Sequence, residues 1–527
     1  MLSRFLFITV LAVSLASAAS LPEEWVPLRW DGGPLEVARR LGSENPIETA
    51  SQRGVIEGWY APETLALLKD TPYNCLVLTW SLGRATDADT AQCELVTKYE
   101  GLLRERGLAV LASVEFGPDW AEAVQAAAGL FDGVVLEGEF PAPAAVEALA
   151  MLRSVNPDAV VIPMGDWQHV QRGEKFPILA NLSGLWPGML SVSEAEEWGA
   201  GPTSNPWVLS NAWQVGVLLA DGSDRPVWMG HRPMKHRPQP LEFADHARAV
   251  ADVGMAGGTW VVALGDDLRE RLHKGEDEAL DEWRRLGEHV KFFGKRQQWR
   301  AFKTWPSVVV VHDPAAGGEF DSFDVLNMLS VYHVPHRIVL RKDFPDKQVE
   351  DGSAVLIYDF EPGPAQEVDK LREFTGAGGT LLLGPRWREA GDSAPELIAG
   401  AGSIRRYPPE EVDSDRFSRN VRDLVEDKHA APRPYNVGSI VSLYRYDPSS
   451  DRALLQMTEY GDYPTENITV RFPRAIKSAT VHSIEGEPLE LKIYEGDKGG
   501  SEIDIPEVPG YCGIIIEFQQ GDGHAGE

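Results

Sequence analysis

The sequence has few cysteines and few basic side chains. It contains 3 Cys in 527 residues, and 50 Lys plus Arg stand against 80 Asp plus Glu, a formal net charge of -30. Three cysteines are too few for a disulfide scaffold, and their spacing matches no zinc motif, although Cys75 and Cys93 could form one bridge. A surface this acidic repels phosphate backbones, so we expect no nucleic-acid partner.

Several catalytic signatures are also absent. No GxGxxG follows the first predicted strand, and neither HExxH nor GxSxG occurs in the chain. These absences argue against dinucleotide binding, zinc proteolysis and serine-hydrolase chemistry. The sequence therefore predicts neither a bound metal ion nor a cofactor.

Long apolar runs are missing except at the start. Arg4 precedes an apolar run over residues 5–15, and the small residues 16–18 follow it. This pattern predicts a secretory signal at residues 1–18 and a secreted or periplasmic protein whose mature chain begins near Ala19. An uncleaved anchor is the alternative, but the run is shorter than the ~20 apolar residues of a spanning helix. We expect no membrane span after signal cleavage.

Residues 24–300 alternate short β-branched runs with amphipathic segments, which is typical of βα repeats. Eight such runs over this length match a (β/α)8 barrel, which usually has ~250 residues; an open doubly wound sheet is the alternative. Strands are predicted at residues 26–30, 74–80, 108–116, 133–140, 159–166, 184–190, 226–231 and 259–264. Helices are predicted at residues 88–107, 119–131, 142–154, 205–220, 241–254 and 275–293.

Two further units are predicted after the barrel. Residues 306–405 hold continuous apolar runs between helical segments, as in a parallel sheet covered on both faces, which predicts a flavodoxin- or amidotransferase-like α/β domain. An acidic, Pro-containing stretch follows at residues 407–427. Residues 430–519 hold alternating β-type runs separated by turn residues, which predicts a small antiparallel β-sandwich.

The order of these units, with the sequence LREFTGAGGTLLLG at residues 371–384, resembles that of glycoside hydrolases of the β-galactosidase type. The resemblance implies a barrel that cleaves glycosidic bonds, a middle domain similar to a glutamine amidotransferase that serves in assembly of a homotrimer, and a C-terminal β domain. No cysteine lies between Cys93 and Cys512, so the middle domain has no thiol nucleophile for amidotransferase chemistry.

The first catalytic candidates are two glutamates near the end of the fourth predicted strand. Residues 133–140 read GVVLEGEF, and strand alternation predicts that Glu137 and Glu139 share one side. Two carboxylates are costly on the helix-covered side, so we expect both at the barrel mouth, with Glu139 as the first choice for a proton donor. The resemblance adds that the family carries its acid/base glutamate on the fourth strand. The alternative is that both acids pair with an interior arginine such as Arg29.

Glycoside cleavage by this chemistry needs a second carboxylate within about 5–10 Å of the first. Asp166 and Glu115, at the ends of two other predicted strands, are the candidates. Asp31 and Asp266 also lie at predicted strand ends. A structural role remains the alternative for each of them, because acids at strand ends also cap helices.

Two features of the resembling family are missing. Its acid/base glutamate follows an asparagine, whereas Glu137 follows Leu136 and Glu139 follows Gly138. Its nucleophile is a glutamate that ends the seventh strand, whereas the seventh predicted strand here ends at His231. Either a different residue fills the role, or the strand count differs, or catalysis is lost.

Tryptophan is frequent, with 16 in the chain. Flat aromatic faces suit the apolar faces of sugar rings, so indoles at the barrel mouth predict an oligo- or polysaccharide substrate. His231 begins a basic cluster that could bind an acidic sugar group, or could be a solvated loop. The alternative functions are a non-catalytic carbohydrate-binding protein and an assembly protein that uses the barrel as a scaffold. The tryptophans at predicted strand ends are Trp30, Trp80, Trp167, Trp228 and Trp260.

Overall fold

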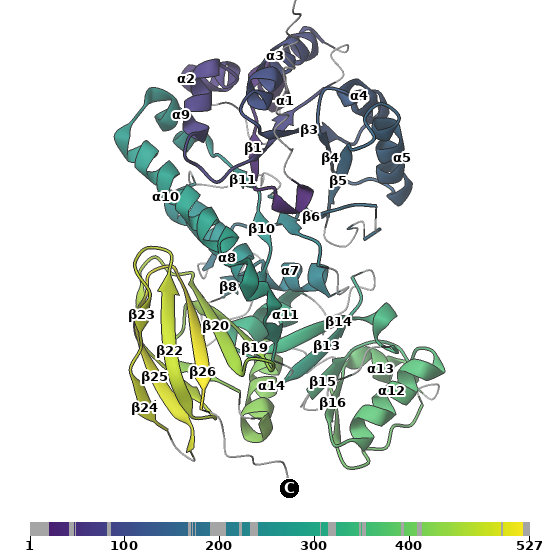
Figure 1. Cartoon of the computed structure of the whole chain (residues 1–527). Helices are drawn as coiled ribbons and strands as arrows, with labels where there is room; N and C mark the ends of the chain where they lie inside the picture. Colours follow the sequence, from purple (N-terminus) through teal and green to yellow (C-terminus); the bar gives the residue numbers. More distant parts are fainter. Residues whose placement is uncertain are drawn as a thin grey trace, which may run out of the picture.

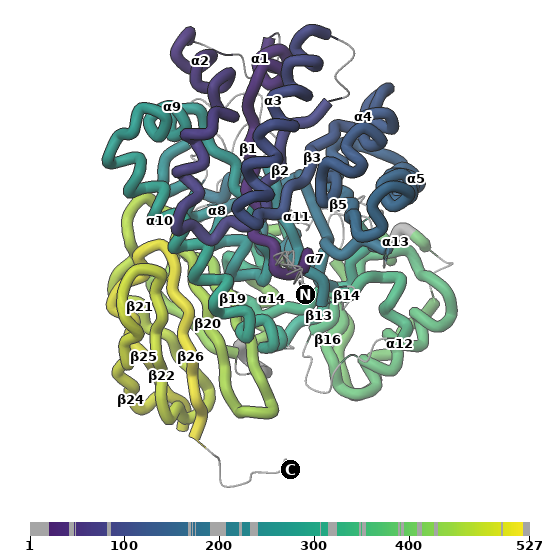
Figure 2. The backbone as a smooth tube through the Cα atoms, turned by 45° about the horizontal axis from the view of Figure 1, so that its top comes forward, coloured from purple at the N-terminus to yellow at the C-terminus, as the bar shows by residue number. Residues whose placement is uncertain are grey.

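The computed structural model arranges the chain as a barrel, a parallel α/β unit and a β-sandwich, which lie at the top, lower right and lower left of Figure 1. The turned view of Figure 2 keeps the three units apart in the same way. The structure describes residues 21–41, 47, 49–81, 86–166, 170, 172–173, 175–189, 207–220, 224–231, 241–305, 307–314, 323–346, 349, 355–391, 395–407, 414–429, 431–496 and 499–519. Among these residues, no helix is long and apolar enough to cross a membrane.

The barrel sheet is parallel and returns to its first strand. Its strands are β1 (Pro27–Trp30), β2 (Cys75–Thr79), β3 (Ala109–Glu115), β4 (Gly133–Glu137), β5 (Val160–Gly165), β6 (Leu179–Asn181), β9 (Val227–Met229), β10 (Thr259–Trp260) and β11 (Val262–Ala263). The short strands β10 and β11 flank Val261, and β10 pairs with β9 while β11 pairs with β1. Together these two occupy the place of the eighth strand, which confirms the predicted (β/α)8 fold class.

Helices cover the outside of the barrel. They are α1 (Gly33–Arg40), α2 (Ala50–Gly58), α3 (Asp87–Arg104), α4 (Trp120–Ala127), α5 (Ala142–Arg153), α7 (Ala212–Leu219), α8 (Phe243–Ala256), α9 (Asp266–Lys274) and α10 (Asp277–Gly294). Threonines start two of them: the Thr49 hydroxyl accepts from Gln52 N at 3.1 Å, and the Thr86 hydroxyl accepts from Asp89 N at 3.2 Å. These bonds satisfy backbone N–H groups that a helix start leaves open.

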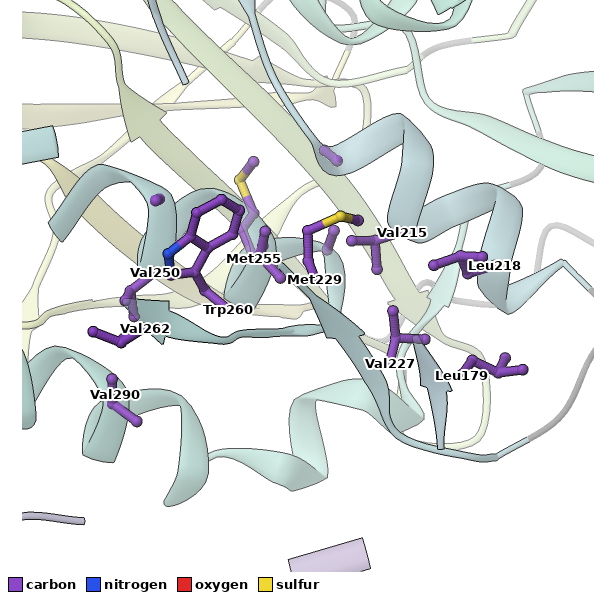
Figure 3. Close-up of a cluster of buried hydrophobic side chains, with 14 of the residues drawn as sticks. Leu179, Val215, Leu218, Val227, Met229, Val250, Met255, Trp260, Val262 and Val290 are labelled. Carbon is purple, nitrogen blue, oxygen red and sulfur yellow. The ribbon is translucent and has the colours of Figure 1, made fainter. Parts of the chain in front are cut away.

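Alternation along the strands creates two apolar layers. Inward-facing side chains, such as Val77, Leu111, Val135 and Trp228, form a cluster inside the barrel. Outward-facing side chains join the large core beneath the helices. Figure 3 shows part of that outer core, where side chains of β6, β9, β10 and β11 meet side chains of α7, α8 and α10.

The middle unit is a five-stranded parallel sheet. Its strands are β13 (Val308–His312), β14 (His336–Leu340), β15 (Val355–Tyr358), β16 (Thr380–Leu383) and β17 (Ser403–Arg406), in the order β14-β13-β15-β16-β17. This is the flavodoxin-like order. The helices of the unit are α11 (Phe323–Val331), α12 (Ala365–Gly376), α13 (Pro385–Glu389) and α14 (Ser414–His429).

The glycine-rich sequence of the middle unit is a turn between α12 and β16. Gly378 has φ +100°, which L-residues rarely adopt. A Cβ on Gly379 would lie 2.3 Å from the ring of Phe374, so helix and strand approach too closely for a side chain there. The motif therefore has a packing explanation.

The last unit has two antiparallel sheets that share one core. The strands are β12 (Lys303–Thr304), β18 (Arg433–Tyr435), β19 (Ile440–Asp447), β20 (Arg452–Glu459), β21 (Thr465–Phe472), β22 (Ile476–Ser483), β23 (Leu489–Glu490), β24 (Ile493–Glu495), β25 (Ser501–Val508) and β26 (Tyr511–Phe518). One sheet has the order β12-β19-β20-β26-β22-β23 and the other β18-β21-β25-β24. β12 precedes the middle unit in sequence but joins this sandwich through β19.

The structure corrects several details of the sequence analysis. The sixth barrel strand is β6, not residues 184–190; part of that range forms β7 (Gly188–Met189), which pairs with β8 (Val208–Leu209). The fourth strand stops at Glu137, because Gly138 turns the backbone with φ +106°. Cys75 and Cys93 form no bridge. α14 occupies much of the stretch at residues 407–427, which was not predicted to be helical.

One buried polar network joins the three units. The carboxylate of Asp252, on α8, accepts from Ser210 Oγ at 2.5 Å, from Asn211 N at 2.7 Å and from the Tyr460 hydroxyl, which follows β20 of the sandwich. Asn327, on α11 of the middle unit, accepts from Ser210 N at 3.2 Å through Oδ1. Burial is the largest influence on the pKa of Asp252 and raises it, against the opposing effect of these donors.

We expect Tyr460→Phe to lower the free energy of unfolding by about 1–3 kcal/mol, because it removes a donor from a buried carboxylate. Urea unfolding monitored by circular dichroism measures the change. The control is Tyr463→Phe, three residues later, where the side chain is 84% exposed. Equal destabilisation by the two variants would contradict a role for the buried hydroxyl.

The raised pKa of Asp252 predicts a pH dependence with a defined sign. The folded state holds a proton on Asp252 at a higher pH than the unfolded chain does, so this group adds stability as the pH falls through its raised pKa towards the ordinary aspartate range. Asp252→Asn removes that contribution. The difference in unfolding free energy between wild type and Asp252→Asn should therefore grow in favour of wild type as the pH falls from 7 towards about 4. A stability difference between wild type and Asp252→Asn that does not change with pH would contradict the raised pKa of Asp252.

Candidate functional site

An arginine clasp lies at the carboxyl end of the barrel. Arg29, on β1, donates from Nη1 and Nη2 to the two carboxylate oxygens of Glu137, on β4, at 2.7 and 2.9 Å. Its Nε donates to Asp31 Oδ2 at 2.6 Å, and Thr79 Oγ1 donates to Asp31 Oδ1 at 3.0 Å. We call Arg29, Asp31 and Glu137 the Arg29 clasp. It connects strands that are not neighbours in the sheet.

The clasp brings one positive and two negative side chains together where little of each is exposed to solvent. The side chains of Arg29, Asp31 and Glu137 are 19%, 19% and 11% exposed. Burial by itself would lower the pKa of Arg29, but the charges of Asp31 and Glu137 outweigh it and keep the pKa above its ordinary value. Both oxygens of Glu137 accept hydrogen bonds from Arg29, so in this arrangement Glu137 is an acceptor and not a proton donor.

Glu115 lies beside the clasp. It ends β3, and in the parallel ladder it is paired with Glu137 of β4. Neighbouring strands lie about 4.8 Å apart, and residues in register point to the same side of the sheet. Unlike Glu137, Glu115 is exposed. The structure thus puts an exposed and a clasped carboxylate next to each other at the rim.

Glu139 does not follow the predicted alternation. Because β4 ends at Glu137 and Gly138 takes a left-handed conformation, Glu139 is no longer on the strand and the expectation that it shares a face with Glu137 fails. Glu139 is exposed in the loop that leads to α5.

The remaining predicted carboxylates lie at other strand ends. Asp166 follows β5 and accepts a hydrogen bond from Ser183 Oγ at 2.9 Å. Asp266 forms a two-point ion pair with Arg40, at 2.9 and 2.7 Å. Burial is the largest single influence and would raise the pKa of Asp266, but Arg40 and Arg269 together outweigh it and lower that pKa. Asp266 therefore serves to join α9 to α1.

Four of the five predicted tryptophans are covered by protein. Trp30, Trp80, Trp228 and Trp260 are 0%, 3%, 1% and 3% exposed. Trp30, Trp80 and Trp260 belong to the outer core, and Trp228 fills the barrel interior. Their rings therefore pack in the cores and do not form the expected ring of indoles at the mouth. Trp167 lies outside the described residues.

Other aromatic side chains, partly buried, lie at the carboxyl ends of the strands. Phe116 follows β3 directly, and its ring lies 5.4 Å from Trp120 and 6.1 Å from Phe140, between ring centroids. Phe140 follows β4 after two further residues. Sequence analysis did not single out Phe116 or Phe140 as binding residues. The signal for both was their position as the last residue of a predicted strand.

His231 follows β9. Its Nδ1 lies 2.9 Å from Gly184 O, and its ring centroid lies 5.2 Å from that of Trp186. Trp186 comes from the loop after β6 and also contacts Trp260. Sequence analysis did not single out Trp186. Among the described residues, no group of three or more His, Cys, Asp or Glu side chains could hold a metal ion.

We expect Arg29→Gln to lower the free energy of unfolding by about 3 kcal/mol, because it leaves Asp31 and Glu137 without their counter-charge. Adding Glu137→Gln should restore part of the loss, since one of the two facing carboxylates is then neutral. The control is Arg53→Gln, whose partner Glu57 lies 2.9 Å away on the surface, and it should change stability by less than about 0.5 kcal/mol. Strictly additive effects in a double-mutant cycle would contradict the clasp.

No protein-family model matches the sequence, and no curated protein is similar to it. Among solved structures, the chain is similar to α-L-fucosidase isoenzyme 2 from Paenibacillus thiaminolyticus, with a TM-score of 0.58, 10% identity, and coverage of 94% of this chain and 100% of that chain. More distant similarities include an exo-carrageenase GH42 from Bacteroides ovatus (TM-score 0.43, 11% identity, 71% and 54% covered). Another is an exo-β-1,4-mannosidase from Opitutaceae bacterium strain TAV5 (TM-score 0.41, 14% identity, 72% and 79% covered). These structures are glycoside hydrolases, and the chain shares the fold of the fucosidase over nearly its whole length.

Proposed function

We propose that this protein is a glycoside hydrolase that cleaves O-glycosidic bonds with two carboxylates at the carboxyl end of its barrel. The observation that carries the proposal is the placement of Glu115 beside Glu137 in the ladder of β3 and β4. The fold shared with a fucosidase supports the reaction class. Active sites of such barrels lie at this end of the strands.

The two carboxylates suit different tasks. Glu137 is held by Arg29 as an acceptor on both oxygens, which favours a role as the anion that faces the sugar carbon. Glu115 is exposed and free to approach the glycosidic oxygen as a proton donor; Glu139, the first choice from the sequence, is the other exposed acid. Retaining enzymes hold their two carboxyl groups ~5–5.5 Å apart, a separation that side chains in register on neighbouring strands can reach, so we propose a retaining reaction.

The proposed reaction has two steps. Glu115 gives its proton to the glycosidic oxygen while an oxygen of Glu137 bonds to the sugar carbon, so the C–O bond breaks and the alcohol leaves. Water then attacks that carbon, gives a proton to Glu115 and frees Glu137. Arg29 can release one Glu137 oxygen because Asp31 continues to hold the guanidinium.

Sugar recognition is proposed for the half-buried aromatic side chains at the rim. Phe116 and Phe140 follow the strands that carry the two glutamates, and their faces suit the apolar side of a pyranose ring. His231, which follows β9, is proposed to bind a hydroxyl or an acidic group of the sugar. Export by the signal at residues 1–18 and assembly as a homotrimer stay predictions.

The test is hydrolysis of a panel of 4-nitrophenyl glycosides by wild type and three single variants. We expect Glu115→Gln and Glu137→Gln to lower kcat by at least about 100-fold, because each removes a proton-transfer or nucleophilic group. Glu139→Gln should stay within a few fold of wild type. The matched control is Glu147→Gln, on the exposed face of α5.

Three outcomes decide the proposal. Loss of activity in Glu139→Gln with activity kept in Glu115→Gln would reassign the proton donor. Full activity in both Glu115→Gln and Glu137→Gln would refute the carboxylate pair. Saccharide binding without any product from wild type, across the panel and natural glycans, would show a non-catalytic carbohydrate-binding protein instead.

A further inference from the structure

Two arginines of the sandwich point towards the barrel. Arg445 on β19 is opposite Leu454 on β20 in the antiparallel ladder, and Arg452 lies two residues before Leu454, so all three side chains leave the same side of the sheet. Leu454 belongs to the large core that the sandwich shares with the barrel. On this side β20 packs against α8 (Figure 1), where Thr458 Oγ1 lies 3.4 Å from Met255 Sδ. Diagonal neighbours such as the two arginines lie about 7–8 Å apart, within reach of long side chains.

A third arginine comes from the segment that leaves the barrel. Arg300 lies in the short 3-10 helix η4 (Gln297–Ala301), which follows α10. A Cβ on Gly257, directly after α8, would lie 4.0 Å from Arg300 Cγ and 4.0 Å from Arg445 Nη2, so both arginines flank the end of that helix. We call Arg300, Arg445 and Arg452 the seam arginines, because they lie where the barrel meets the sandwich.

Few hydrogen-bond donors of the seam arginines are in use. Arg445 donates from Nη2 to Ala256 O at 2.8 Å. The guanidinium carbon of Arg452 lies 5.7 Å from the ring centroid of Phe302, and its Nε is buried without an acceptor. Within the described ranges of the chain, the side chains of Arg452 and Arg300 have no hydrogen-bond or ion-pair partner. A guanidinium has five N–H donors, and a buried donor in a folded protein normally has an acceptor, so these arginines lack one.

The acids nearest in the ladder are directed elsewhere. Asp447, on the same side of β19 as Arg445, accepts a hydrogen bond from Ser449 N at 2.9 Å. Glu517, opposite Arg452 on β26, pairs with Lys477 at 3.4 Å. In the part of the chain that the structure describes, no carboxylate forms an ion pair with a seam arginine. The group therefore carries an uncompensated positive charge.

This charge has a measurable consequence in a chain of opposite charge. Burial is the largest influence on the pKa of Arg445, which falls to about 10; Tyr511 opposes that change, and the positive charge of Arg300 adds to it. The segment between Glu288 and Asp313 holds five Lys and Arg and no acid, although the whole chain carries a net charge of -30. Basic side chains gathered in this way create a local attraction for an anion.

We propose that the seam arginines bind an oxyanion, namely a sulfate or phosphate group. A guanidinium can pair two N–H donors with two oxygens of such a group, and a doubly negative group supplies both the missing acceptors and the missing counter-charge. Arg300 is exposed, so the group can enter from solvent, whereas Arg445 and Arg452 are half-buried. The group can be a free inorganic ion or an ester carried by a saccharide.

The site is separate from the proposed catalytic rim. α8 ends at Ala256 and the strand β10 begins at Thr259, so the end of α8 lies at the amino end of the barrel strands. The Arg29 clasp lies at their carboxyl end. The inference therefore does not depend on hydrolysis of glycosides.

The test is equilibrium dialysis of the full chain against radiolabelled sulfate, at an ionic strength held constant with sodium chloride. We expect about one sulfate per chain at millimolar sulfate, because so acidic a chain attracts few anions elsewhere. Arg300→Gln should weaken binding about fivefold or more, since it removes one of the charge-assisted donors. Arg300 has no contact to lose among the described residues, so its variant should keep the melting temperature of wild type in the absence of sulfate.

A second variant and a matched control locate the bound ion. Arg452→Gln should weaken sulfate binding to a similar extent. The control is Arg106→Gln, which removes the same charge from an exposed arginine whose Nη1 donates to a helix carbonyl, Leu102 O, at 3.0 Å, as Arg445 does to Ala256 O. Binding by this control should equal that of wild type.

Competition with galactose 6-sulfate and with galactose separates the two sources of the oxyanion. Displacement of labelled sulfate by galactose 6-sulfate at a lower concentration than unlabelled sulfate requires would assign the site to a sulfated saccharide, and weaker displacement would assign it to the free ion. Absence of bound sulfate on wild type, full binding by either Arg300→Gln or Arg452→Gln, equal weakening by Arg106→Gln, or displacement by galactose itself would overturn the proposal.

Discussion

The guanidinium of Arg29 is the interaction on which the upper part of the barrel depends. Below it, the inward-facing side chains are apolar and fill the barrel as a packed core. Above it lie the ends of β1, β3 and β4, with Asp31, Glu115 and Glu137 close together. Without a cation between them, the mostly buried carboxylates of Asp31 and Glu137 would repel one another. Arg29 therefore marks the boundary between the packed interior and the rim that carries the carboxylates.

The inward orientation of Arg29 and Val261 explains why the tryptophans on β1 and β10 are not at the rim. A charged side chain cannot face the apolar layer beneath the helices, so Arg29 must point inward. Since side chains alternate along a strand, its neighbours Leu28 and Trp30 then face outward, and both are in the outer core. Val261 points inward in the same way, which turns Trp260 towards the helices. In the proposed function, sugar binding is thus left to residues that follow the strands, such as Phe116 and Phe140.

The buried carboxylate of Asp252 is at the centre of the polar contact between the three units. It receives donors from the barrel and from the sandwich, and Asn327 of the middle unit bonds to the backbone of Ser210 beside it. A buried carboxylate depends on the exact positions of its hydrogen-bond donors, because each bond that is lost leaves one of its oxygens without a partner. This network fixes Tyr460 of the sandwich and Asn327 of the middle unit against the barrel segment that carries Ser210 and Asp252.

Most strands of the barrel could be predicted from the sequence, because long β-branched runs such as 108–116 and 159–166 are compatible with few structures other than a strand. The weak sixth strand was misplaced, since residues 179–181 carry only three strand positions and the apolar run at 184–190 is the longer signal. The alternation of side chains along a strand does not extend to Glu139, because Gly138 has a positive φ and ends the strand before it. The catalytic candidates on β3 and β4 were found separately, but nothing in the sequence showed that they are paired.

By itself the sequence determined the class of each unit, since period and length of apolar runs depend only on local geometry and burial. It also determined that acids gather at the ends of strands. Only the tertiary structure decided which acids meet, that Glu137 is clasped while Glu115 is exposed, and that three of the tryptophans pack beneath the helices. Those outcomes depend on strand register and on contacts between residues more than a hundred positions apart, and such contacts leave no signature in a single chain.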